Sequence, residues 1–111
     1  MRVNWYEKVG IKTNGEIIKE LLSGEEHPIG IALAEVKEAR LHYHRKTREY
    51  YIVLRGEGKL ILEEEELPLK EGDLVYIEPM KKHKAKTEKG KLEILVISCP
   101  PWSKEDHFEV E

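Results

Sequence analysis

The sequence predicts an all-β domain, built as a sandwich or closed barrel of short strands. Apolar or alternating runs recur from residue 29 onward, and turn residues such as Gly, Pro and Asp separate them. The length of 111 residues suits one domain. A composition of 40% hydrophobic and 37% charged residues provides a core, and it excludes both a disordered chain and a membrane protein.

Residues 1–38 are expected to form an N-terminal arm together with the first strand of the barrel. The Asn14-Gly15 pair indicates a turn. The segment 17–22 has apolar residues spaced for either a helix or a strand, and the pattern does not decide between them. Residues 29–36 alternate as a half-buried strand does.

Residues 39–99 are expected to form the core of the barrel. The predicted strands cover residues 41–44, 49–54, 59–63, 74–77, 83–87 and 92–98. Turn signals lie between them at residues 55–58, 67–68, 71–73, 78–79 and 89–91. Four consecutive glutamates at 63–66 repel one another and indicate a solvated hairpin end.

Residues 100–111 are expected to form a tail that leaves the sheet. The tail opens with Pro100-Pro101, and proline has no N–H to donate to a β ladder. Trp102 is expected to pack back over the domain as a lid. The apolar residues of 92–97 occupy both faces of their strand, so the outer face needs a cover as well.

The net charge and the amino-acid composition indicate which binding partners, cellular location and source organism to expect. A formal net charge of -3 gives no positive field for nucleic acid or anionic lipid. The single cysteine, Cys99, cannot form an internal disulfide, and the opening residues lack a secretory apolar stretch, so a cytoplasmic location is expected. Carboxylates are mostly Glu and Gln is absent, which favours a thermophilic source.

Four residues in the middle of the chain have the chemistry of a metal site. His42 and His44 lie two apart, so on a strand their imidazoles point to the same face. After a turn, Glu49 can add a carboxylate from a neighbouring strand, and His83 can add a third imidazole. Three nitrogens and one oxygen suit a divalent Mn, Fe, Co, Ni, Cu or Zn ion with positions left for water or a small-molecule ligand.

These spacings resemble the cupin superfamily of small jelly-roll barrels. Its first motif, Gly-x5-His-x-His-x4-Glu-x6-Gly, is matched by His42, His44, Glu49 and Gly56, with Val36 at the leading glycine. Its second motif is matched at Gly72 and His83, with Thr87 in place of Asn. The resemblance covers residues 36–98. It implies a single-domain cupin jelly-roll barrel with a short N-terminal arm, and a homodimer.

Simpler interpretations exist for each of these residues. His42 and His44 can be strand histidines that face solvent, and Glu49 can form an ordinary salt bridge with the cations of residues 45–48. His83 lies among lysines and can belong to a basic surface strand. The remaining histidines, His27 and His107, match neither motif and are expected on the surface.

Other residues are candidates for substrate contact or proton transfer. By strand alternation Tyr51 shares the inward face of Glu49, so both are candidate catalytic residues. Arg40 shares the face of His42, and Lys81 and Lys82 precede His83, so these three are candidates for binding an anionic substrate.

Three functions remain open at this level. The first is a metal-dependent enzyme that acts on a small acidic or polyhydroxy substrate, with dioxygenase-like or isomerase-like chemistry unresolved. The second is a non-catalytic module that binds a small ligand. The third is a metal that only stabilises the barrel. A homodimer is expected to form through the outer sheet faces, with residues 1–20 crossing between subunits.

Overall fold

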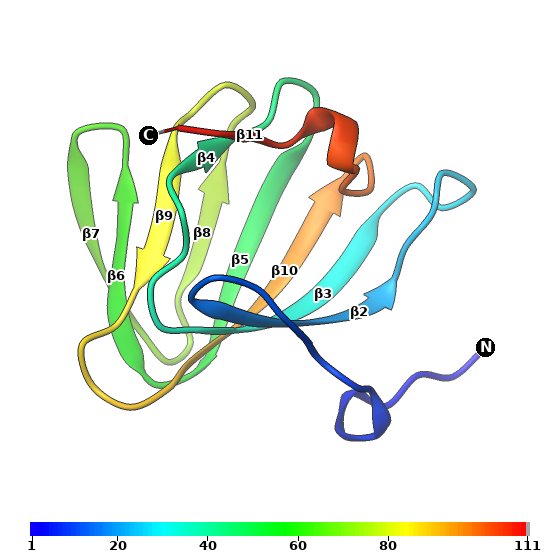
Figure 1. The fold of residues 1–111 in the computed structure, drawn as a ribbon, viewed down its shortest axis with the longest axis horizontal. Helices are drawn as coiled ribbons and strands as arrows, with labels where there is room; N and C mark the ends of the chain where they lie inside the picture. The colour runs from blue at the N-terminus through cyan, green and yellow to red at the C-terminus, as the bar shows by residue number, and fades with distance from the viewer. Residues whose placement is uncertain (111) are drawn as a thin grey trace.

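The computed structural model describes residues 1–110, which form two antiparallel β-sheets packed face to face (Figure 1). The larger sheet has six strands in the order β1-β2-β3-β10-β5-β8. Its strands are β1 (Ile11–Lys12), β2 (Glu16–Leu22), β3 (Gly30–Val36), β10 (Leu92–Cys99), β5 (Arg48–Arg55) and β8 (Leu74–Ile77). The predicted all-β jelly-roll class is confirmed.

The smaller sheet has five strands in the order β11-β4-β9-β6-β7. Its strands are β11 (Phe108–Glu109), β4 (His42–Tyr43), β9 (His83–Lys86), β6 (Glu57–Leu62) and β7 (Glu65–Lys70). Two short 3-10 helices, η1 (Trp5–Glu7) and η2 (Lys104–Asp106), precede the first strand and the last one. No helix within residues 1–110 has the length and apolar character needed to cross a bilayer.

The core lies between the sheets and is formed by alternate residues of the central strands. In β10 the pairs Leu92–Val36 and Ile94–Ala34 face inward across the ladder to β3, and all four side chains are buried. On the opposite sheet, Leu60 and Ala85 form a cross-strand pair that is buried as well. This alternation is the physical basis of the strand predictions.

One glycine of the first motif has a structural reason to be glycine. Gly56 joins β5 to β6 at a φ of 90°, a left-handed conformation that other residues rarely adopt. A Cβ atom at this position would also overlap the backbone carbonyl oxygen of Lys91. The turn that directs β5 into the second sheet therefore requires this residue.

The structure decides one local prediction that the pattern left open and corrects two others. The ambiguous segment 17–22 is a strand, since it lies within β2. The turn predicted at 67–68 is wrong, because Leu67 and Pro68 lie inside β7, an edge strand where the missing proline N–H leaves no ladder bond unpaired. The tail leaves the larger sheet as expected but then joins the smaller one, because β11 pairs with β4.

Candidate metal centre

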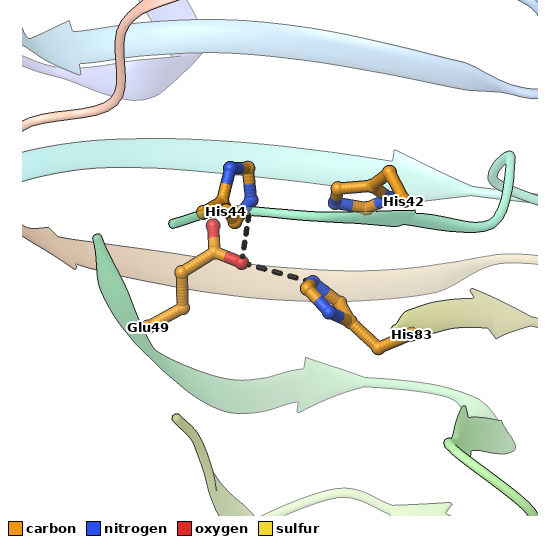
Figure 2. A group of neighbouring side chains, drawn as sticks. All are labelled: His42, His44, Glu49 and His83. Atoms are coloured by element: carbon orange, nitrogen blue, oxygen red, sulfur yellow. Dashed lines mark hydrogen bonds and ion pairs between the residues drawn. The ribbon is translucent and has the colours of Figure 1, made fainter. Parts of the chain in front are cut away.

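Four buried side chains from three segments lie close together (Figure 2). In the smaller sheet His42 of β4 pairs directly with His83 of β9, and His44 comes immediately after the end of β4. Glu49 reaches them from β5 of the larger sheet. One ligand atom from each residue lies within 4.8 Å of all the others, and all four residues are buried. Figure 2 shows His44 and His83 turned toward the same carboxylate oxygen of Glu49.

Backbone carbonyls determine which nitrogen of each imidazole is free. The Nδ1 atoms of His42, His44 and His83 lie 2.8, 2.9 and 2.8 Å from the carbonyl oxygens of Arg40, Asp106 and Lys81, respectively. A carbonyl oxygen can only accept, so each Nδ1 donates a proton. The Nε2 atoms are therefore the nitrogens that each of the three rings could offer to a metal ion.

The charges in the cluster are strongly coupled. Burial by itself raises the pKa of Glu49, but the close contacts and positive charge of His44 and His83 outweigh it and hold this pKa far below the usual range. Burial also favours the neutral form of His44, yet the neighbouring Glu49 carboxylate and the Asp106 carbonyl raise the pKa of His44 overall. Burial lowers the pKa of His42 to about 3, with the charge of His83 as a further cause. His42 is therefore neutral at pH 7 and Glu49 is ionised.

The geometry fits a divalent metal ion. The Nε2 atom of His83 lies 3.0 Å from Oε1 of Glu49, in hydrogen-bond geometry. The Nε2 atom of His44 lies 3.2 Å from the same oxygen as an ion-pair contact, but the angles are not those of a hydrogen bond. This buried nitrogen therefore has no hydrogen-bond partner within residues 1–110. Three imidazole nitrogens and one oxygen of an ionised carboxylate are the donor set of a borderline divalent ion.

The C-terminal segment supports the centre in a way that the sequence pattern did not predict. Figure 1 shows this segment crossing the end of the sandwich beside β4. The carboxylate of Asp106 accepts from the backbone N–H groups of Arg45, Lys46 and Thr47, at 2.9 to 3.2 Å. These groups belong to the turn that separates His44 from Glu49. Asp106 thus holds this turn with its side chain and His44 with its carbonyl.

The prediction that His107 lies on the surface is wrong. Its ring is half-buried and stacks on the ring of His42, with centroids 4.6 Å apart and planes inclined by 15°. Trp102 donates from Nε1 to Nδ1 of His107 at 3.1 Å, so this side chain packs back as expected. The residues around position 107 show no strand alternation, and the pairing of β11 with β4 alone brings this histidine to the site.

Replacing Asp106 by alanine is expected to destabilise the protein by about 2–4 kcal/mol, because three backbone N–H groups lose a charged acceptor. Thermal unfolding followed by circular dichroism measures this loss, and metal affinity is expected to fall with it. Asp73→Ala is the matched control, since Asp73 accepts from a backbone N–H in an exposed turn. Equal losses in both variants would contradict a special role for Asp106.

A cavity of about 520 Å³ opens beside the cluster. His42, His44 and Glu49 form part of its wall, and Tyr51 lines it too. Among the predicted substrate-binding residues, Arg40 lines the cavity. Within residues 1–110 the cavity lining includes neither Lys81 nor Lys82, which are exposed.

Glu16 of β2 is a cavity residue that the sequence analysis did not single out. It lines the same cavity as the cluster. Burial, and then the negative charge of Glu49, raise the pKa of Glu16. The sequence would have indicated that position 16 faces inward only if segment 17–22 had been recognised as a strand.

Comparison with known proteins gives a family and a fold. Residues 32–98 match the family described as the cupin domain. An uncharacterised protein of Methanocaldococcus jannaschii is 36% identical over 110 residues, which cover 91% of this chain and 88% of that protein.

Solved structures share the whole architecture at low sequence identity. Pac13 from Streptomyces, a nucleoside dehydratase, is 18% identical with a TM-score of 0.84, covering 100% of this chain and 91% of that one. A predicted oxalate decarboxylase from Thermotoga maritima is 22% identical with a TM-score of 0.82, covering 89% of this chain and 98% of that one. At these identities the likeness establishes the fold alone.

Proposed function

We propose that this chain, which belongs to the cupin domain family, binds one divalent metal ion and uses it to hold a small ligand in the adjoining cavity. His42, His44, Glu49 and His83 would hold the ion. The unpartnered Nε2 atom of His44, buried and directed at Glu49, is the observation that carries the proposal. When bound, the ion supplies Lewis acidity toward oxygen atoms of the ligand.

The cavity favours a role in ligand binding over a purely structural metal. A structural site is closed, with protein atoms at every position around the ion. Here three of the four cluster residues form part of the wall of a hollow large enough for a small organic molecule. We propose an acidic or polyhydroxy molecule that uses two oxygens as ligand. The structural neighbours include a dehydratase and a predicted decarboxylase, so their names do not select one reaction.

Elemental analysis of the protein purified without chelators tests the proposal. The expected result is about one equivalent of a transition metal per chain. Incubation with diketones, oxalate and sugar phosphates, with and without oxygen, then distinguishes an oxygenase from an isomerase. Tight binding of one compound without turnover would support a binding module instead. Protein that neither carries nor takes up a metal would contradict the proposal.

Metal affinity is expected to rise with pH. The raised pKa of His44 means that its metal-free ring keeps a proton to a higher pH than an ordinary histidine does, and the ion must displace that proton. Below this pKa, the apparent affinity falls roughly tenfold per pH unit for each proton displaced. Calorimetric titration in two buffers with different ionisation enthalpies measures the proton release directly. An affinity that is constant between pH 5.5 and 7 would rule out this proton exchange.

Tyr51 and Glu49 are the residues that we propose for proton handling. Tyr51 is buried, its ring centroid lies 6.1 Å from that of His83, and it lines the cavity. Burial raises its pKa well above the ordinary value, so at pH 7 it offers a hydroxyl proton and not a phenolate. In Tyr51→Phe we expect metal content to be unchanged and turnover of an identified substrate to fall about 10²–10⁴-fold. Full turnover in this variant would assign Tyr51 to packing alone.

A further inference from the structure

The cavity beside the metal centre has two chemically different walls. One wall carries the cluster residues His42, His44 and Glu49. The other is the inner face of β2, β3 and β10, strands that are neighbours in the larger sheet (Figure 1). The lining of β3 and β10 there is mostly apolar, whereas β2 contributes both apolar and acidic side chains: Ile18, Leu22, Ala32, Ala34 and Val96 are apolar, and Glu16, Glu20 and Ser98 are polar. A ligand bound to the cluster would therefore extend along the apolar side chains of β3 and β10.

Small side chains on β3 make room for such a ligand. Ala32 pairs with Val96 across the β3–β10 ladder, and Ala34 pairs with Ile94. An alanine fills far less space than the leucine or isoleucine typical of a packed sheet interior, so this column leaves the core open on one side. The cavity volume of about 520 Å³ lies within the range of small-molecule sites. The cavity can therefore hold a molecule much larger than a water bound to the ion.

The charges on the cavity lining disfavour polyanions. Within residues 1–110, Arg40 is the single lysine or arginine on the lining, and its Nη1 atom already lies 3.3 Å from Oε1 of Glu109. Glu16 and Glu20 of β2 face the same space. A phosphate group would thus come close to several carboxyl groups with no free cation apart from the metal ion.

We infer that this cavity takes a small neutral or singly charged molecule that has two adjacent oxygen donors at one end and an apolar body, and not a phosphorylated compound. This inference rests on the proposed metal function, because the oxygen donors need the ion. The apolar body contacts the wall of Ala32, Ala34 and Val96. The two oxygens occupy the side of the centre that opens to the cavity.

A pair of hydroxamic acids tests the inference, since both chelate through the same two oxygens. The full chain is loaded with Co²⁺, its loading is verified by elemental analysis, and binding is followed by visible absorption and calorimetry. Benzohydroxamic acid is expected to bind about tenfold or more tightly than acetohydroxamic acid, after correction for their affinities for free Co²⁺, because its ring buries more apolar area. Phosphoglycolate is expected to bind more weakly than either.

Two substitutions on β3 test whether the preference for benzohydroxamic acid arises at the apolar wall of the cavity. Ala32→Leu fills the apolar wall and is expected to remove the preference for benzohydroxamic acid, with Co²⁺ content and acetohydroxamic acid affinity unchanged. Glu35→Leu is the matched control, because Glu35 lies three residues along on the opposite face of the strand. Loaded protein that binds both hydroxamic acids equally, or that prefers phosphoglycolate, overturns this inference and leaves the metal proposal intact. Protein that takes up no Co²⁺ overturns both.

Discussion

Replacing His44 by alanine is expected to lower metal affinity by at least about 100-fold. Loss of a residue that only supports a metal ligand lowers the affinity by up to about 100-fold, and we expect loss of a ligand itself to lower it at least as much. The substitution removes the one cluster nitrogen that is buried and lacks a hydrogen-bond partner within residues 1–110. It also removes a neighbour that keeps Glu49 ionised. Equilibrium dialysis against a metal-buffered solution measures the change.

His27→Ala is the control for this substitution, because His27 is a partly exposed histidine whose Nε2 atom pairs with Glu26 at 3.6 Å. This variant is expected to keep its full metal content. Circular dichroism establishes that His44→Ala remains folded, so that a loss of metal is not a loss of structure. A folded His44→Ala protein with one equivalent of metal at the original affinity would show that the ligand assignment is wrong.

The cluster could be predicted because strand periodicity is local. His42 and His44 lie two residues apart, so any extended backbone places their rings on the same face, whatever the rest of the chain does. The partners Glu49 and His83 needed more than periodicity. Their place depends on which strands become neighbours, and the motif resemblance supplied this information.

The role of the tail could not be predicted, because it depends on pairing between segments far apart in the chain. Proline at 100 and 101 correctly indicated an exit from the larger sheet. Nothing in the local pattern indicated that β11 would pair with β4 and bring Asp106 and His107 to the centre. Such pairings have no periodic signal of their own.

The homodimer remains a prediction. Leu74 and Tyr76 of the edge strand β8 are 64% and 44% exposed. These apolar side chains lie on the sheet that the sequence analysis expected to be covered by a second copy. The thermophilic source and the cytoplasmic location likewise remain predictions.

Metal binding is expected to raise the melting temperature of this protein by about 15 °C. An ion that binds only the folded chain stabilises it by about 4 kcal/mol at a free concentration 1,000 times its dissociation constant. For a domain of this size each kcal/mol corresponds to roughly 4 °C. The metal-free protein should still fold, because Glu49 is hydrogen-bonded to His83 and paired with His44 without an ion.

The size of this shift separates a site preformed by the fold from adventitious binding. The four proposed ligand residues span 41 positions of the sequence, from His42 to His83, and come from both sheets, so they converge only when both sheets are assembled. The unfolded chain therefore cannot offer the same affinity, and differential scanning calorimetry with and without the ion measures the difference. His44→Ala should abolish the shift. A shift of similar size in that variant would mean that the stabilising ion binds elsewhere on the protein. An unchanged melting temperature in the wild type would mean that the ion does not bind the folded chain in preference to the unfolded one.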